Sequence, residues 1–360
     1  MRTLFICFVF VLTQPVAAQQ KKPLPPLSQR IAVLQQNIAR YFYDSASHHY
    51  KEHNYLTAED KKKYAYLWPL CALIQAANEV QVVQPKSQLL PQVLHSIQAY
   101  YDNAPPAPAY NSYVVSAEKD DRFYDDNQWI GIACMDAFVR TKDSVYLKQG
   151  LMAYQFMMTA FDTVAGGGLY WKEKDYTTKN TCSNGPGAVL ALQLYAATKN
   201  KAYLDTAQML LRWVDAKLLS PEGVYYDHVQ LPARTIDKRR YTYNTGTMLE
   251  SYVLLYELLG DKKYLTRAQK MAADAYKYFY KGGRWPSHYW FNVVLLRGYL
   301  RLAKHDANKK YINSFRAEGD RIWQQEKDKM HLIGTGNRKA LIDQAAMLEW
   351  YARLAQQKNM

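Results

Sequence analysis

The chain has 360 residues and a formal net charge of +14, and 49% of its residues are hydrophobic, which excludes an intrinsically disordered protein. A basic chain can bind nucleic acid or anionic polymers. Its lysines, however, are scattered, with one short run at residues 61–63, so we expect a mostly solvated basic surface and no nucleic-acid partner.

Residues 1–18 have the features of a signal peptide. Arg2 precedes an apolar run over residues 4–12, and Val16-Ala17-Ala18 is a plausible cleavage site. The run is too short to span a membrane, and no later segment is apolar over a spanning length. We therefore expect an exported protein, periplasmic or secreted, without stable membrane insertion. Residues 19–26 are predicted as a polar leader and residues 27–360 as a single domain.

Three cysteines, Cys71, Cys134 and Cys182, follow the predicted signal peptide. Apolar helical patterns around Cys71 and Cys134 favour buried free thiols, with one disulfide as the alternative. No Cys-x-x-Cys motif supports a zinc site. His49 and His53 have the spacing of a metal pair, but no zincin glutamate follows His49. We expect no metal ion and no cofactor.

The remaining chain is predicted as alternating helices with very few strand signals. A short phrase containing Tyr-Leu or Tyr-Ile recurs after polar turns, each time at the start of an amphipathic helix, at residues 143–147, 201–204, 261–265 and 308–312. The recurrences lie about 50 to 60 residues apart, the length of a helical hairpin with its loops. Repetition at such a period is typical of a helical array or toroid.

Two kinds of helix alternate. Amphipathic outer helices are predicted at residues 29–43, 87–101, 145–161, 202–218, 262–280 and 310–325. Helices that are apolar on most faces, and therefore buried, are predicted at 64–80, 129–141, 185–198, 246–260, 290–304 and 340–356. Six inner and six outer helices predict an all-α fold, an (α/α)6 barrel. An open solenoid is the alternative, but it has no enclosed helix layer.

The loops differ in length according to their direction. Connections from an inner to the next outer helix are short, whereas those from an outer to the next inner helix are mostly long and rich in aromatic residues. All long loops therefore lie on the face where the inner helices begin. Long loops on a rigid scaffold usually carry function, so we expect the site there.

Asp125 and Asp126 lie at that face, at the start of the second inner helix. Cleavage of a glycosidic bond needs two carboxyl groups, one as acid and one as nucleophile or base. On consecutive helical residues the two groups would stand about 5–6 Å apart, which suits a retaining mechanism. Such close carboxylates tend to hold one proton, while a helix N-terminus favours the charged form of the other. Helix capping without catalysis is the alternative interpretation.

The stretch from Tyr124 to Trp129 resembles the signature of glycoside hydrolase family 76, the α-1,6-mannanases. Supporting stretches occur in the expected order, at residues 66–69, 167–171, 179–186 and 241–246. The resemblance implies an (α/α)6 fold and retaining hydrolysis of α-1,6-linked mannose chains. It also implies that Asp125 is the nucleophile and Asp126 the acid/base. Thr245 departs from the Gln found in many members, which puts a subsite contact in doubt.

Ten further residues are candidates for sugar binding: Tyr66, Trp68, Tyr124, Asn127, Trp129, Trp171, Asn184, Tyr243, Asn244 and Trp290. The aromatic ones are either sugar platforms or core residues. The asparagines either cap inner helices or bind sugar hydroxyls. Asp227 is a third loop carboxylate, either solvated or bound to a mannose hydroxyl.

The sequence thus predicts an exported, retaining endo-α-1,6-mannanase acting on α-mannan polysaccharide or oligosaccharide. An α-mannosyl transglycosylase on the same fold is one alternative, and a non-catalytic glycan-binding helical protein is another. An unsaturated glucuronyl hydrolase or a sugar epimerase would use the same barrel. An epimerase requires catalytic histidines in the cavity, for which His228 and His288 are the candidates.

Overall fold

The structure is a computed structural model and describes residues 24–357. The predicted signal peptide and most of the predicted leader lie outside these residues. Six helices form an inner ring: α2 (Leu67–Val83), α4 (Tyr124–Thr141), α6 (Thr181–Thr198), α8 (Thr242–Leu259), α10 (Tyr289–Leu302) and α12 (Leu341–Ala355). Six helices lie outside it: α1 (Leu27–Asn37), α3 (Leu89–Ser96), α5 (Ser144–Met158), α7 (Lys201–Leu218), α9 (Lys262–Phe279) and α11 (Lys310–Gln325). Short irregular helical turns follow α1 (Ile38–Phe42) and α3 (Ile97–Tyr100), and another covers Val164–Gly166.

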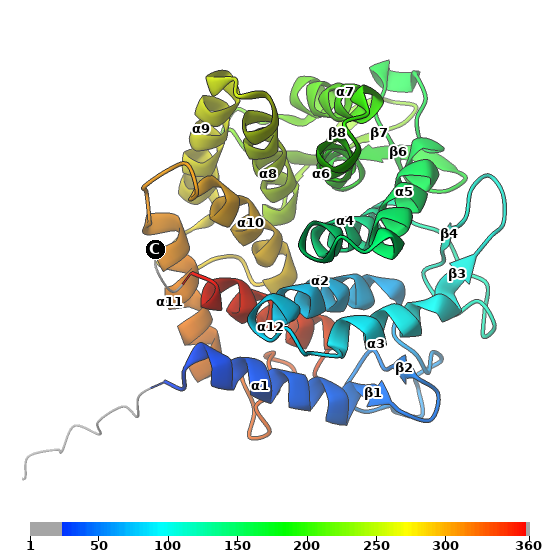
Figure 1. Cartoon of the computed structure of the whole chain (residues 1–360), viewed down its shortest axis with the longest axis vertical. Coiled ribbons are helices and arrows are strands. Elements are labelled where there is room, and N and C mark those ends of the chain that lie inside the picture. The colour runs from blue at the N-terminus through cyan, green and yellow to red at the C-terminus, as the bar shows by residue number, and fades with distance from the viewer. Residues whose placement is uncertain (1–23, 358–360) are drawn as a thin grey trace, which may run out of the picture.

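The inner helices close into a ring (Figure 1). Each packs against the next along the chain, and α12 packs against α2, while the outer helices cover the ring one by one. The burial pattern follows this arrangement. Every residue from Thr181 to Leu194 of α6 is buried, whereas α9 buries only a stripe at three- and four-residue spacing. The predicted (α/α)6 barrel is confirmed, and the open solenoid is wrong.

The turns at which the inner helices end explain the recurring phrase in the sequence. Helices α4, α6 and α8 are each followed by one residue in the left-handed conformation, namely Lys142, Lys199 and Gly260. The next residue, Asp143, Asn200 or Asp261, caps the following outer helix by accepting a backbone N–H two residues ahead. These tight turns define the rear face of the barrel.

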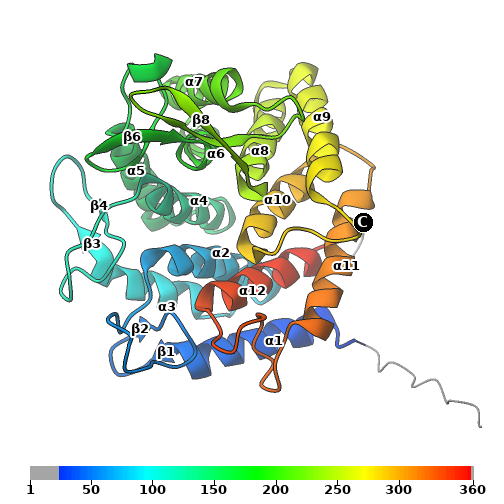
Figure 2. The same ribbon diagram turned by 180° about the vertical axis from the view of Figure 1, so that it is seen from behind.

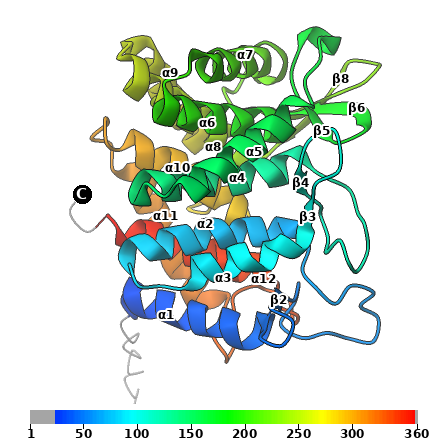
Figure 3. The same ribbon diagram turned by 45° about the vertical axis from the view of Figure 1, so that its right-hand side comes forward.

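The opposite end, which we call the front face, holds the long loops, as predicted. All the named strands lie at this end (Figure 3), although the sequence showed very few strand signals. Two small hairpins pair β1 (Tyr43–Asp44) with β2 (His49–Tyr50) and β3 (Tyr101–Asp102) with β4 (Ala109–Tyr110). An antiparallel sheet joins β5 (Tyr170–Lys172), β6 (Asp175–Asn180), β7 (Tyr226–Gln230) and β8 (Thr235–Arg240) in that order. It crosses the front of α6 and α8 (Figure 2). The strands are short and mostly polar, so they lack the alternation of apolar and polar residues from which a strand is predicted.

Helices α4, α6 and α8 begin several residues earlier than predicted. Their first turns are polar, and polar residues before an apolar run were interpreted as loop. Asp125 and Asp126 lie in the first turn of α4, at the helix start where they were expected.

The three cysteines are buried free thiols, as predicted. Within residues 24–357, no helix combines the length and apolar character that crossing a membrane requires.

Candidate active site

A cavity of about 600 Å³ opens on the front face, between the first turns of the inner helices and the sheet. This size is typical of a small-ligand site. We refer to it as the cavity, and its lining residues are Glu52, Tyr66, Trp68, Pro69, Ser112, Phe123, Asp125, Asp126, Trp171, Thr178, Asn180, Cys182, Asp227, His228, Arg239, Tyr241, Tyr243 and Phe291.

Asp125 and Asp126 lie together in this wall, each only 6% exposed. Neither has an ion-pair partner among the described residues. Trp171 on β5 donates its indole N–H to Oδ2 of Asp125 at 3.2 Å. The pair sits in the first turn of α4, where the helix dipole favours a negative charge.

The two carboxyl groups differ in proton affinity. Burial raises the pKa of Asp125 from 3.8 to about 6, although the nearby Cys182 thiol and the Trp171 hydrogen bond lower it. Burial, together with the neighbouring Asp125 charge, raises the pKa of Asp126 well above the ordinary value. Asp125 therefore ionises first and Asp126 keeps its proton. This division between two adjacent carboxyl groups is the one that acid-and-nucleophile chemistry requires.

Four of the predicted sugar-binding residues line the cavity: Tyr66, Trp68, Trp171 and Tyr243. Tyr66 and Trp171 are more than one-third exposed, so their rings are open to a ligand. Phe291 also lines the cavity and contacts the Tyr243 ring, with 4.1 Å between the ring centres.

The predicted aromatic contacts Tyr124, Trp129 and Trp290 are instead buried and do not line the cavity. Tyr124 stacks on Phe156 at 4.7 Å between ring centres. Trp290 packs against Trp129 and against Trp68, with ring centres 5.6 and 4.3 Å apart. The structure favours the core interpretation for these three residues, because their ring faces pack against other aromatic side chains. Trp290 instead packs against the ring of Trp68 on the side away from the cavity lining.

The asparagines Asn127, Asn184 and Asn244 are also buried outside the cavity lining, which favours a structural role over sugar binding. Asn127 accepts the backbone N–H of Tyr110 at 2.8 Å and donates to its carbonyl oxygen at 3.0 Å. Asn184 binds Leu169 in the same two-way manner. Each amide also donates to the carbonyl four residues earlier. They clamp front-face loops onto the inner helices.

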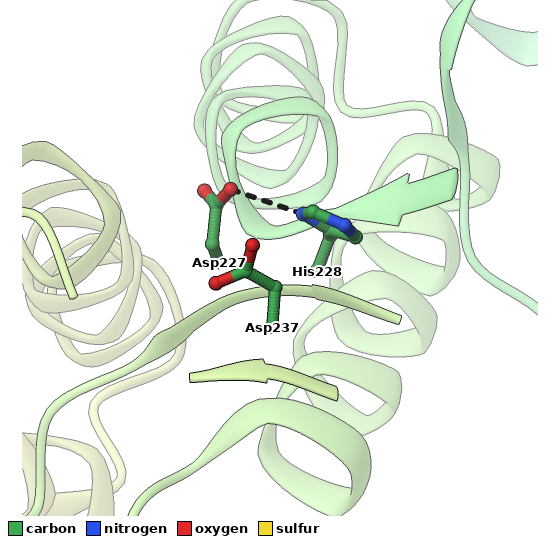
Figure 4. Close-up of side chains that lie close together, drawn as sticks. All are labelled: Asp227, His228 and Asp237. Carbon is green, nitrogen blue, oxygen red and sulfur yellow. Dashed lines mark hydrogen bonds and ion pairs between the residues drawn. The ribbon is translucent and has the colours of Figure 1, made fainter. Parts of the chain in front are cut away.

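Asp227, the third predicted carboxylate, lines the cavity with His228 (Figure 4). His228 Nδ1 lies 3.0 Å from Asp227 Oδ2, and this hydrogen bond raises the pKa of His228. Asn244 donates to Asp227 Oδ1 at 3.4 Å, so it supports the wall rather than a sugar.

Asp227, His228 and Asp237 lie close enough together to hold a metal ion. Arg239, however, binds both oxygens of Asp237 and lies 3.8 Å from Asp227 Oδ2. Because a guanidinium already neutralises these carboxylates, the donor set favours hydrogen bonding to a ligand over a divalent cation.

His288 does not line the cavity. It caps α10 by accepting the N–H of Phe291 and stacks on that ring. The pair of cavity histidines that an epimerase requires is therefore not formed.

Sequence reasoning missed several lining residues, including Glu52, Ser112, Thr178, Cys182 and Arg239. Glu52, Ser112 and Arg239 come from separate loops and strands, and nothing in their local sequence marks them. Cys182 was read as a buried thiol only, although it belongs to the supporting stretch 179–186. That stretch was the one signal that could have found it.

A closed ring of six helical hairpins with a buried carboxyl pair in an aromatic-walled cavity defines a glycosidase-type (α/α)6 barrel. Comparison with known proteins agrees. The chain belongs to glycosyl hydrolase family 76, whose sequence model matches residues 28–292.

Two curated relatives are mannan endo-1,6-alpha-mannosidases named DCW1. The protein of Candida glabrata is 32% identical over 168 residues, which are 42% of this chain and 37% of the relative. That of Saccharomyces cerevisiae is 28% identical over 48% of this chain and 42% of the relative. The chain thus spans about two-fifths of the length of these relatives.

Solved structures are similar over nearly the whole chain. A family 76 glycoside hydrolase from a bovine Bacteroides thetaiotaomicron strain superposes with a TM-score of 0.84 at 25% identity, covering 93% of this chain and 78% of the other. A family 76 mannosidase from B. thetaiotaomicron VPI-5482 gives a TM-score of 0.83 at 25% identity over 93% and 100% of the two chains.

Proposed function

We propose that this protein is an exported, retaining endo-α-1,6-mannanase. The observation that carries the proposal is the buried Asp125–Asp126 pair, whose members differ in pKa and face one aromatic-walled cavity. The names of the fungal relatives support α-1,6-linked mannan as the substrate. Export rests on the signal-peptide pattern of residues 1–18.

In the first step, an oxygen of the ionised Asp125 attacks the anomeric carbon while the bond from that carbon to the leaving oxygen breaks. Asp126 transfers its proton to the leaving oxygen, so a covalent mannosyl-enzyme and a shortened chain result. In the second step, Asp126, now ionised, takes a proton from water, and the water oxygen attacks the anomeric carbon. Asp125 leaves as a carboxylate, and the configuration of the sugar is retained after two inversions.

The other lining residues supply sugar recognition in this proposal. The open rings of Tyr66 and Trp171 offer apolar faces on which the CH groups of a pyranose can pack. Asp227 and His228 add polar atoms to the cavity lining, where sugar hydroxyls can bind.

The test is incubation of the wild type, Asp125→Asn and Asp126→Asn with debranched α-1,6-mannan, followed by chromatography of the products. We expect a ladder of oligosaccharides from the wild type and a loss of at least about 10²-fold in rate for each variant. Proton NMR of the first products should show the α-anomer. Wild-type rates in Asp125→Asn would overturn the proposal.

Three other outcomes would redirect it. Mannose as the sole early product would indicate exo action. Longer chains formed with added α-mannosyl acceptor would indicate a transglycosylase. Binding of mannan without any turnover, unaffected by Asp126→Ala, would indicate a glycan-binding protein.

A further inference from the structure

Arg122 is a buried cation that the proposed chemistry does not use. It lies just before α4, is 4% exposed, and all five of its N–H donors are occupied. Nε and Nη2 bind the two carboxylate oxygens of Glu173. The other three donate to the carbonyl oxygens of Ala104, Pro105 and Ala107 at 3.0–3.1 Å. A fully bonded guanidinium fixes its neighbours in one geometry.

Glu173, the partner of Arg122, follows β5 directly. Its backbone N–H donates to the carbonyl oxygen of Arg122 at 3.0 Å, and Phe123 pairs with Lys172 as an antiparallel bridge. The backbone and the ion pair thus join the end of β5 to the residues that begin α4.

This junction determines where two cavity residues meet. Trp171 lies two residues before Glu173, and Asp125 lies three residues after Arg122. The Trp171 ring packs on Phe123, with ring centres 4.8 Å apart, and its N–H reaches Asp125 Oδ2 at 3.2 Å. Because Trp171 is 38% exposed on an edge strand, little else restrains it.

We propose that Arg122 and Glu173 are positioning residues, which hold β5 against α4 so that the Trp171 indole stays on Asp125. The proposal rests on the proposed function, in which Asp125 is the nucleophile. The indole then orients the carboxylate, leaving Oδ1, which has no hydrogen-bond partner among the described residues, for attack.

The proposal has a consequence for pH dependence. The Trp171 hydrogen bond lowers the pKa of Asp125, so losing it raises that pKa and moves the acidic limb of activity to higher pH. Other titratable groups that face Asp125 stay in place: Asp126 on α4, Cys71 on α2, Cys182 on α6, Asp227 on β7 and Tyr243 on α8.

The experiment compares Trp171→Phe, Arg122→Lys and the double variant. We expect both single variants to move the acidic limb of kcat/KM by about 0.5 to 1 pH unit to higher pH, as the loss of one hydrogen bond to a carboxylate predicts. The double variant should move it no further than Trp171→Phe alone, because both changes act through the same bond. Glu173→Gln should resemble Arg122→Lys.

Arg321→Lys is the matched control, since Arg321 also forms a two-pronged pair, with Glu318, outside the cavity lining. Arg321→Lys should lower the Tm without moving the acidic limb of the kcat/KM pH profile. If Arg122→Lys behaves like this control, or if the shifts of the single variants add, the positioning role is wrong.

A readout that needs no turnover separates this proposal from the proposed function. The difference in tryptophan fluorescence between the wild type and Trp171→Phe should titrate with Asp125, and Arg122→Lys should displace or abolish that transition. A wild type that is inactive on mannan but shows this titration would leave the positioning role standing and remove the function.

Discussion

The two ends of the barrel treat buried charge in opposite ways. At the rear, Arg297 binds Glu250 and Asp136, with nitrogen–oxygen distances of 2.6 Å for Nε to Glu250 and 3.1 Å for Nη2 to Asp136 Oδ1. Arg353 binds Glu349 and Glu79 in a similar way. At the front, Asp125 and Asp126 are equally buried but have no cationic partner among the described residues.

The difference shows how one scaffold separates stability from chemistry. A buried ion pair whose partners are both present is tolerated, because attraction offsets desolvation. Where a buried carboxyl group has no cation beside it, desolvation raises its pKa, and ionisation of that group destabilises the folded state. The front thus keeps two groups poised for proton transfer, while the rear holds the inner ring together.

Breaking the rear pairing should give the largest effect on stability. Arg297→Met removes the closest cation from the buried Glu250, which keeps only Arg301 at 3.8 Å, and the cation of the half-buried Asp136. Breaking a buried pair in this way typically costs about 3–5 kcal/mol. Urea unfolding should show this loss. At temperatures where the variant is folded, kcat on mannan should stay near that of the wild type.

Lys270→Met is the control for that change, because Lys270 pairs with Asp274 on the exposed face of α9. It should alter stability by less than about 0.5 kcal/mol. Equal losses for the two variants would mean that burial does not distinguish the rear network.

Removing a buried negative charge at the front should increase stability, which is the opposite of the effect expected at the rear. The pKa of Asp125 is raised from 3.8 to about 6, so its ionisation destabilises the fold on the order of 3 kcal/mol at neutral pH. The penalty grows as pH rises from about 4 to 6 and is absent below that range. Asp125→Asn should therefore raise the Tm at pH 7 and lose that advantage near pH 4.

Asp126→Asn tests whether the two adjacent carboxyl groups differ in their effect on stability. Burial and the Asp125 charge raise the pKa of Asp126 well above its ordinary value, so an amide of the same shape removes less negative charge here than at Asp125. Calorimetry at pH 7 should find a smaller gain in Tm than for Asp125→Asn, although both variants lose activity. A larger gain for Asp126→Asn would reverse the assignment of the two protons.

The smallest effect concerns the rear turns. Asp143→Ala removes the side-chain acceptor for the Val145 N–H at the start of α5 and should cost about 1 kcal/mol. Asp143→Asn retains the acceptor and should cost little. Denaturant midpoints check both, and no change in the activity profile is expected because the turn lies at the end opposite the cavity.

Much of the fold was predictable because the sequence patterns that indicate its helices and turns involve residues close together in the chain. The alternation of apolar and amphipathic helices predicts the closed ring, and the polar caps such as Asp143 mark the rear turns. Asp125 and Asp126 were found because this pair stands at the start of an inner helix, on the face that holds the long aromatic loops. The sheet β5–β8 was not found, because mostly polar strands of three to six residues carry no clear periodic signal.

The supporting residues show why the rest required coordinates. Asn127 and Asn184 stand beside the predicted site, but their amides bind the backbone of Tyr110 and Leu169, which the fold alone brings to them. Trp68 and Trp290 are equally aromatic and sit at equivalent helix starts. Only packing decides that Trp68 lines the cavity and Trp290 lies behind it.

The sequence by itself determined the helix order, which connections are long and which are short, and the identity of the adjacent carboxyl groups, since each depends on residues close together in the chain. The tertiary structure decided which carboxyl group is ionised and which residues hold it. Those properties depend on burial and on contacts such as Trp171 to Asp125 and Arg122 to Glu173, which join segments about 50 residues apart.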